Sequence, residues 1–299
     1  MKTFTVSSEE PPVPPLFALG VAVIAVSTSA ILIRLSDAPE PVQASYRVLF
    51  TVVLLVPFGL RRRHEFRHIN RADWLSAMLA GLLLAAHFAA WFESVDRTTV
   101  AASVTLVSMQ PAFVAIGAWL LLNERITRRM TWGIIIALMG ALLMGMEGLI
   151  SPPNTPTPEP LLGNVLAFLG AIFAAGYVLA GRSIRQRVSL SPYVLIVYAI
   201  CALSLFGYTL GLGHSIVHYP LHEWILFLGM ALGPGLLGHT VLNWSLRYVE
   251  SSIVSVSLVG EPVGSALLAF LIFTEVPGPL TILGGSIAIV GILLTSTRG

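Results

Sequence analysis

Two stretches of this chain decide its fold: QPAFVAIGAWLLLNE at residues 110–124 and EPVGSALLAFLIFTE at residues 261–275. Both are apolar, both have proline in second position, and both end in glutamate at an offset of 151 residues. The same offset relates Pro41 to Pro192, Gly133 to Gly284 and Gly140 to Gly291. Self-similarity at a fixed offset indicates that the chain contains one structural unit twice.

The composition is that of an integral membrane protein. Of the 299 residues, 56% are apolar and 11% are charged, and the mean hydropathy is +0.84. A typical soluble domain carries roughly 25% charged residues. The charges gather between apolar runs of about 18 to 23 residues, the length that an α-helix needs to cross the hydrocarbon layer. The runs predict ten spans, at about 16–34, 42–60, 74–93, 98–122, 130–149, 162–181, 192–212, 223–246, 252–274 and 278–296.

The basic residues predict the orientation of these spans. Lysine occurs only at Lys2, and the other sixteen cations are arginines. Arginines gather in the segments 61–71, 125–129 and 182–187, whereas the segments 150–161, 213–222 and 275–279 contain no cation. If both termini are cytoplasmic, fourteen of the seventeen cations lie inside, with Arg34, Arg47 and Arg97 as exceptions. Because cytoplasmic loops are enriched in Lys and Arg, we expect both termini to be cytoplasmic.

A proline-rich segment divides the ten spans into two groups of five. The expected organisation is a cytoplasmic tail at 1–15, a first repeat at 16–149, an external linker at 150–161, a second repeat at 162–296 and a cytoplasmic tail at 297–299. Because five is odd, the second repeat enters the membrane in the opposite orientation. The predicted fold is therefore an all-α integral membrane protein, with ten transmembrane helices in two inverted five-helix repeats around a central cavity.

Prolines and glycines recur at equivalent places in the two halves. Pro111 and Pro262 lie at mid-depth in spans four and nine, where a missing N–H bends a helix. We interpret them as hinges, and a static bend is the alternative. Spans five and ten carry four small residues that let helices approach closely, namely Gly133, Gly140, Gly284 and Gly291. These spans are expected to pack on each other or, in a homodimer, on a second protomer.

Together these features resemble the drug/metabolite transporter superfamily, specifically its ten-span exporters made of two EamA-type repeats. The resemblance is carried by Pro111 with Asn123 and Glu124, by the VGEPV sequence at 259–263 with Glu275, and by the glycines of spans five and ten. It implies a pseudo-two-fold bundle that exports small metabolites by alternating access in a bacterial cytoplasmic membrane. Within the superfamily the chain is most similar to amino-acid exporters, including exporters of aromatic and neutral amino acids.

Ten residues inside the predicted spans are candidates for the substrate cavity: Tyr46, His87, Trp91, Gln110, Tyr177, Tyr198, His239, Asn243, Ser257 and Glu261. Polar groups within a membrane are costly and mark either a pathway or a packed internal partner. His87 and Trp91 are four residues apart and share a helical face. His239 and Asn243 occupy the corresponding place in the second half. The alternative is a histidine bonded to a nearby carbonyl group beside a packing tryptophan.

Glu261 is the sharpest of these candidates. It precedes Pro262 in the middle of span nine, where a carboxyl group can take up a proton or bind a substrate ammonium group. The alternative is a carboxyl group that holds helices together through Arg47, the only cation well inside a span. The span-end glutamates Glu124 and Glu275 are expected to cap loops or to pair with local arginines.

Several function classes are excluded or disfavoured. The net charge of +2 gives no basis for nucleic-acid binding. There is no phosphate-loop motif, and neither HExxH nor GxSxG occurs, so we expect no enzyme activity and no cofactor. The single Cys201 cannot form an intramolecular disulfide. We expect interfacial residues rather than a metal site at His214, His218 and His222. The expected partners are a small-molecule substrate, in the first place an amino acid, and the lipid bilayer. A passive channel remains the alternative.

Overall fold

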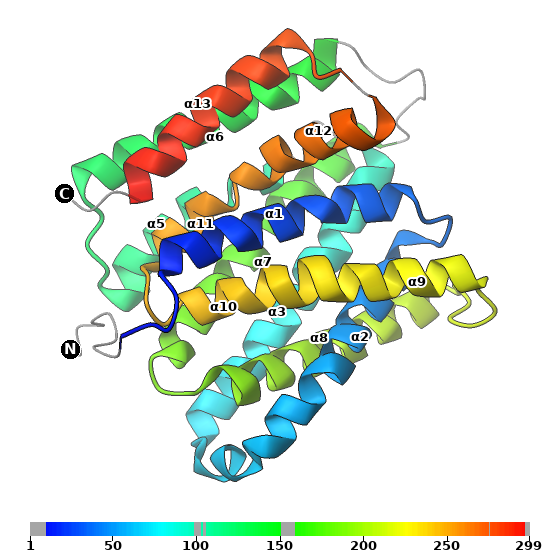
Figure 1. The fold of residues 1–299 in the computed structure, drawn as a ribbon, viewed down its shortest axis with the longest axis vertical. Coiled ribbons are helices and arrows are strands. Elements are labelled where there is room, and N and C mark those ends of the chain that lie inside the picture. Colours follow the sequence, from blue (N-terminus) through cyan, green and yellow to red (C-terminus); the bar gives the residue numbers. More distant parts are fainter. Residues whose placement is uncertain (1–9, 99–102, 104–105, 151–158, 275, 297–299) are drawn as a thin grey trace.

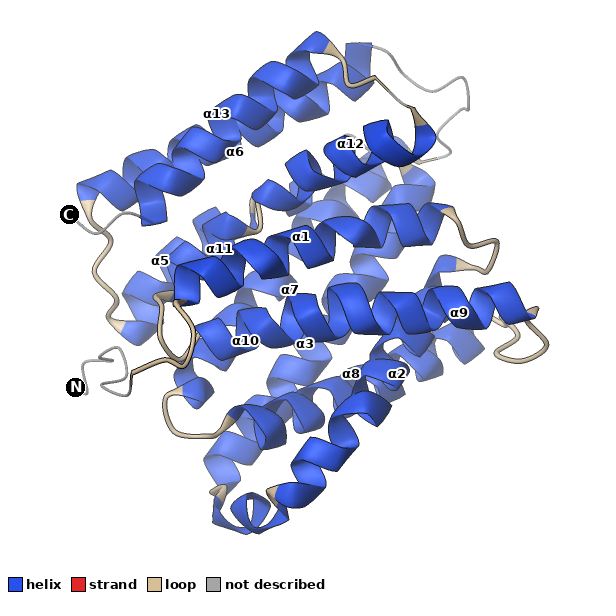
Figure 2. Ribbon diagram, viewed as in Figure 1, coloured by secondary structure: helices blue, strands red, loops and turns tan. Residues whose placement is uncertain are grey.

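The computed structural model describes residues 10–98, 103, 106–150, 159–274 and 276–296, and all regular structure within them is helical (Figures 1 and 2). The helices are α1 (Pro15–Arg34), α2 (Glu40–Arg61), the 3-10 helix η1 (Arg63–His68), α3 (Arg71–Arg97), α5 (Gln110–Leu122), α6 (Arg128–Ile150), α7 (Pro160–Arg185), α8 (Leu190–Gly211), α9 (Leu221–Met230), the π-helix η2 (Ala231–Thr240), α10 (Val241–Ser245), α11 (Ser251–Ser257), α12 (Gly260–Phe273) and α13 (Pro279–Ser296).

Most of these helices are long enough to cross a membrane. Among the described residues, eight helical segments have the necessary length and apolar composition, and α5 and α13 are apolar but shorter. Two of the eight are composite: α9, η2 and α10 follow one another as Leu221–Ser245, and α11 with α12 makes up Ser251–Phe273. The chain is therefore a multi-pass helical membrane protein, while the count of ten spans and the cytoplasmic placement of the termini stay predictions.

The packing of the helices repeats at the offset found in the sequence. Helix α3 packs along α7, and its counterpart, the rod of α9, η2 and α10, packs along α1. Helix α5 packs on α7, as α12 packs on α1. Helix α2 packs on its own counterpart α8, and α6 on its counterpart α13 at one edge of the bundle (Figure 1). The two halves are thus interleaved rather than separate, so a site at the centre is built from both.

The arginine-rich segments gather at one end of the bundle. Arg182, near the end of α7, meets Glu124 just beyond α5 at 2.7 Å. Arg187 meets Asp73 at the start of α3 at 2.6 Å. Helix α1 begins and α13 ends on this side as well (Figure 1). We call this side the basic end and the other side the opposite end.

The two repeated prolines begin helices instead of bending them. We expected continuous spans at 98–122 and 252–274, each kinked in the middle. In the structure α11 ends at Ser257, a turn follows, and Pro262 lies in the first turn of α12. Pro111 is the second residue of α5. A proline in the first turn removes no helical hydrogen bond, and at Pro262 the expected kink is a break between α11 and α12. The hinge role stays a prediction.

Helices α5 and α12 also end alike. Asn123 and Thr274 follow their last residues with φ angles of 53° and 56°, in the left-handed region. A left-handed residue stops a helix and redirects the chain. After Asn123, the Glu124 N–H donates to the carbonyl oxygen of Ala118 at 3.1 Å. This hydrogen-bonded turn fixes the backbone position from which the Glu124 side chain extends.

The four repeated glycines lie where α6 and α13 touch. A Cβ added at Gly140 would lie 2.5 Å from the carbonyl oxygen of Gly284. A Cβ added at Gly291 would lie 2.6 Å from the carbonyl oxygen of Gly133. Both distances are far below van der Waals contact, so the two helices approach backbone to backbone.

Candidate functional site

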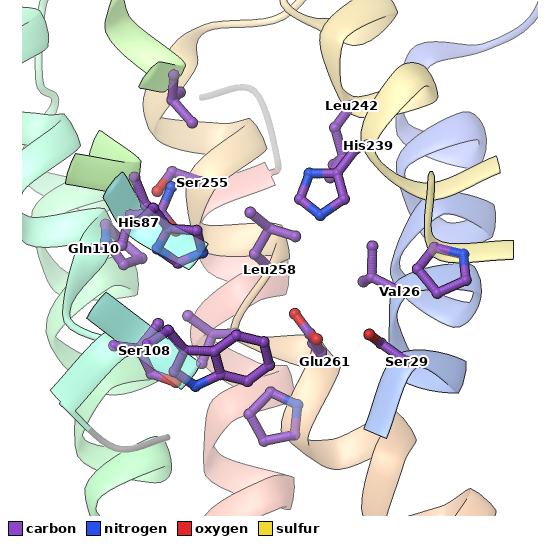
Figure 3. Close-up of a pocket in the computed structure, with 18 of the residues that line it drawn as sticks. Val26, Ser29, His87, Ser108, Gln110, His239, Leu242, Ser255, Leu258 and Glu261 are labelled. Carbon is purple, nitrogen blue, oxygen red and sulfur yellow. The ribbon is translucent and has the colours of Figure 1, made fainter. Parts of the chain in front are cut away.

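A cavity of about 690 Å³ lies at the centre of the bundle, with walls from both halves of the chain. Seven of the ten candidate residues line it, together with Pro111 and Pro262: His87, Trp91, Gln110, Tyr177, His239, Asn243 and Glu261. Figure 3 shows His87 and Gln110 on one side and His239 and Ser29 on the other, with Glu261 between the two sides. Chain positions 152 residues apart, 87 and 239, thus face one cavity.

Tyr46 and Ser257 lie outside the lining of this cavity. Tyr46 packs into an aromatic cluster, where its ring stacks on Phe227 with centroids 5.2 Å apart, and its hydroxyl group donates to the Ile216 carbonyl oxygen. The Ser257 hydroxyl group donates to the carbonyl oxygen of Ile253 at 2.8 Å, within its own helix. Both side chains have satisfied partners elsewhere, so neither is available to a ligand in this conformation.

Arg47 is the buried cation of the cavity. Its Nη1 donates to Ser29 Oγ at 3.0 Å, and its Nη2 lies 3.2 Å from His239 Nε2. The guanidinium carbon is 4.6 Å from the centroid of the Phe88 ring, a cation–π geometry. Because arginine has no acceptor, His239 Nε2 must accept, which places the proton of the neutral imidazole on Nδ1.

Arg47 does not neutralise Glu261 by direct contact. Both residues line the cavity, but no ion pair within 4.0 Å joins them in the part of the chain that the structure describes. The backbone of Glu261 is tied to α1, since the Ser27 hydroxyl group donates to its carbonyl oxygen at 3.2 Å. The helix-holding pair considered from the sequence is therefore not formed here. The cavity instead presents a guanidinium group and a carboxyl group separately.

His87 and Trp91 form a flat wall on α3. Their rings are nearly parallel, at 5°, with centroids 6.3 Å apart. His87 Nδ1 lies 2.9 Å from the Gly170 carbonyl oxygen, so this nitrogen carries the proton and donates. The indole Nε1 of Trp91 is buried and has no hydrogen-bond partner among the described residues. Both interpretations of His87 from the sequence apply at once: its side chain is bonded to a carbonyl group, and it also lines the cavity.

Asn243 ties three helices together behind His239. Its Nδ2 lies 2.5 Å and 3.0 Å from the hydroxyl oxygens of Tyr177 and Tyr198 and 2.8 Å from the His239 carbonyl oxygen, and its two N–H groups donate within this set of acceptors. Tyr198 also lies 3.4 Å from the Thr240 hydroxyl group and is 2% exposed. It therefore supports the wall from behind, whereas Tyr177 and Asn243 line the cavity.

Comparison with known proteins identifies the family. The model of the EamA-like transporter family matches residues 14–146 and 161–297, one stretch in each half. The chain belongs to this family. Similar proteins are the pseudopaline exporter CntI of Pseudomonas aeruginosa, 28% identical over 73% of this chain and 74% of that protein, and the riboflavin transporter ImpX of Fusobacterium nucleatum, 28% identical over 64% and 65%. An uncharacterized transporter of Archaeoglobus fulgidus is 23% identical over 95% of this chain and 96% of its own length.

A solved crystal structure shares the fold of this EamA-family protein. The TM-score is 0.77 at 18% identity, covering 94% of this chain and 96% of the other. The resemblance to the drug/metabolite transporter superfamily is thus confirmed, and so is the expectation of a transporter rather than an enzyme. Its substrate is a small molecule, and its surroundings are membrane lipid.

Ion pairs of this EamA-family transporter account for charges at both ends. At the basic end, Glu124 pairs with Arg182, and its counterpart Glu275 lies outside the described residues. At the opposite end, Arg97, one of the exceptions to the charge pattern, pairs with Glu93 at 2.9 Å and with Glu159 at 2.8 Å. Hydrogen bonding and charge from Glu93 raise the Arg97 pKa above its ordinary value.

The three histidines between α8 and α9 do not share a helical face. Gly213 and His218 have φ angles of 79° and 69°, which no helix accommodates. The four-residue spacing from His214 through His218 to His222 therefore does not place the three side chains on one face of a helix. His222 Nε2 lies 3.1 Å from Glu223 Oε1, and this pair sits at the start of α9.

Proposed function

We propose that this EamA-family protein is a secondary-type exporter of amino acids and related small metabolites, working by alternating access in a bacterial cytoplasmic membrane. The observation that carries the proposal is the pair of opposite groups, Arg47 and Glu261, that share one cavity without contacting each other. An α-amino acid presents a carboxylate group and an ammonium group, and the two residues complement them in charge.

The surroundings of Arg47 support a carboxylate ligand. The side chain is 4% exposed, and the partners of its two terminal nitrogens, Ser29 and His239, supply neutral acceptors. A buried cation without an anionic partner is costly, because its desolvation is not repaid. A substrate carboxylate within reach of the guanidinium group supplies that partner, and it also gains charge-assisted hydrogen bonds.

The remaining walls support an apolar or aromatic substituent. The parallel rings of His87 and Trp91 offer a flat surface, and Met144 and Leu258 add apolar contact. Aromatic rings bind one another in offset or edge-on arrangements. This composition agrees with neutral and aromatic amino acids better than with charged side chains.

The size of the cavity favours a second candidate, a larger amino-acid derivative or another small metabolite. A volume of about 690 Å³ lies within the range of roughly 300–1,000 Å³ typical of pockets that enclose drug-sized ligands. A single amino acid leaves room for water in such a space. Two relatives are named for pseudopaline and for riboflavin rather than for a standard amino acid.

Competition in proteoliposomes tests the role of Arg47. We would compare an amino acid with its methyl ester, which lacks the carboxylate, as competitors of one labelled amino acid. Loss of a hydrogen bond to a charged group costs about 1.5–3 kcal/mol, so the ester should compete roughly 10- to 150-fold more weakly. In Arg47→Met the amino acid and the ester should compete equally. Arg97→Gln, which removes an exposed cation outside the cavity, should behave like the wild type.

Two results would contradict the proposal. One is a wild-type protein that does not distinguish the acid from its ester, and the other is Arg47→Met retaining the full distinction in a monodisperse sample. Counterflow separates a carrier from a channel. Unlabelled substrate loaded inside the vesicles should accelerate uptake of labelled substrate by a carrier, and no acceleration would favour the channel.

A further inference from the structure

A buried polar cluster lies beside the cavity at the basic end. Glu124 Oε1 accepts from Arg182 Nε at 2.7 Å, and Glu124 Oε2 accepts from the Ser251 hydroxyl group at 2.8 Å and the Ser251 N–H at 3.2 Å. Arg182 Nη1 donates to the Leu246 carbonyl oxygen at 2.7 Å. Glu124, Arg182 and Ser251 are 5%, 0% and 0% exposed. We call these three residues the latch.

The latch joins four parts of the chain from both halves. Glu124 follows α5 in the first half, Arg182 belongs to α7, Leu246 follows α10, and Ser251 begins α11. Leu246 itself lines the cavity, as does Ser255, one turn beyond Ser251. The latch therefore adjoins the wall of the cavity on this side.

Other hydrogen bonds beside the latch bind the end of α7 to the end of α10. Arg185 Nε donates to the Asn243 carbonyl oxygen at 3.1 Å, and Gln186 Nε2 donates to the carbonyl oxygens of Leu246 and Arg247 at 3.2 Å each. The end of α7 is thus bonded along the end of α10. Helix α12, which runs toward the opposite end, has no buried residue among those described and is held to α1 by the Ser265 hydroxyl group, which donates to the Ser27 carbonyl oxygen at 3.0 Å, and by Arg34, whose guanidinium carbon lies 4.6 Å from the Phe273 ring centroid. Toward the opposite end, Thr281 of α13 also lines the cavity.

Two polar side chains of helix α11, outside the latch, have no hydrogen-bond partner among the residues that the structure describes. The hydroxyl groups of Ser252 and Ser255 are buried and have no hydrogen-bond partner within the described ranges. Buried polar groups are almost always bonded, so their state needs an explanation. A helix that exchanges partners between two positions leaves some groups unsatisfied in one of them. The N–H and hydroxyl groups of Ser251 bind the start of α11 to Glu124, which lies just beyond α5.

We propose that the latch is the gate of the cavity at the basic end, and that breaking it releases α11 and admits substrate from that side. The inference rests on the proposed alternating access. In the expected topology the basic end is cytoplasmic, so the latch is the gate of the cytoplasmic entrance. Buried charges suit this role, because they are stable only when fully bonded and therefore give two discrete states.

Cysteine accessibility tests the gate without any substrate. The native Cys201 is 0% exposed and is replaced by alanine to remove background labelling. Ser255→Cys then reports the basic end, and Ser265→Cys, at the sixth residue of α12 on the cavity wall, reports the opposite end. A membrane-impermeant maleimide is applied to each face of oriented vesicles. Glu124→Gln should raise labelling of the first reporter from the basic face at least tenfold and lower labelling of the second from the other face.

Further variants separate a gate from general loosening. Arg182→Gln should act like Glu124→Gln, and the double variant should add little, because both substitutions break one interaction. Arg97→Gln, which breaks partly exposed ion pairs away from the latch, should change neither reporter. The proposal is overturned if monodisperse latch variants label as the parent does, or if both reporters become faster together. A shift in labelling without amino-acid competition would keep the gate and reject the substrate assignment.

Discussion

The contact between α6 and α13 allows a sharp test, the substitution Gly140→Ala. The added Cβ would lie 2.5 Å from the Gly284 carbonyl oxygen and 2.8 Å from the Cα of Ala288. Ordinary contact begins at 3.4 Å, so α13 would have to move away by nearly 1 Å. Both neighbours are backbone atoms, and no side-chain rotation can relieve the overlap.

The expected cost follows from this geometry. Overpacking of a tight contact costs about 1–3 kcal/mol. The higher helix propensity of alanine returns up to about 1 kcal/mol. The net destabilisation is therefore up to about 2 kcal/mol, or up to roughly 8 °C in apparent melting temperature on the scale of a 150–250-residue domain.

Gly207→Ala is the matched control, because no heavy atom lies within 4 Å of a Cβ at that position in α8. It should leave stability unchanged or raise it slightly. Both variants would be heated in detergent, and the fraction remaining monodisperse would be followed by size-exclusion chromatography. Equal melting temperatures for Gly140→Ala and Gly207→Ala would refute the argument from backbone contact.

Three further predictions concern the site and the surface. Glu261→Gln should abolish the response of proteoliposome flux to a pH gradient if the carboxyl group carries the coupling proton, and an unchanged response would remove it from that role. Asn243→Ala should lower stability by about 1–3 kcal/mol, because buried tyrosine hydroxyl groups lose their donor, and a melting curve equal to that of the parent would argue against it. Glu65 lies outside the membrane. Burial opposes ionisation of its carboxyl group, but hydrogen bonds from Ser189 and Arg62 outweigh the effect of burial and lower the pKa of Glu65. The resulting stabilisation is present above the ordinary carboxyl pKa of about 4.3 and is lost as pH falls through the lower folded value. Ser189→Ala should therefore reduce melting temperature more at pH 7 than at low pH, and an equal reduction at both would contradict the assignment.

Much of the cavity wall was predictable because helical spacing is strict. His87 with Trp91, and His239 with Asn243, are four residues apart, so each pair shares one face of its helix. The repeat then suggested that the two faces belong to one site. All four residues line the cavity.

Helix rotation was not predictable where polar residues adjoin. Tyr46 and Arg47 are neighbours, and successive residues on a helix point roughly 100° apart. Arg47 faces the cavity, so Tyr46 is turned into the aromatic cluster. Which of two polar neighbours faces inward depends on what the adjoining helices offer, and here Ser29 and His239 bind the arginine.

The sequence by itself determined the membrane class, the duplication and the grouping of basic segments, because the bilayer dictates the length of apolar runs and the repeat is written in residue identities. Tertiary structure decided that α11 and α12 are separate helices, that Arg47 and Glu261 do not pair, and that Glu124 binds Arg182 and Ser251. These outcomes depend on side chains from distant segments meeting at a few ångströms. The local sequence pattern carries no information on these contacts, because each contact forms only when both halves of the chain pack around the cavity.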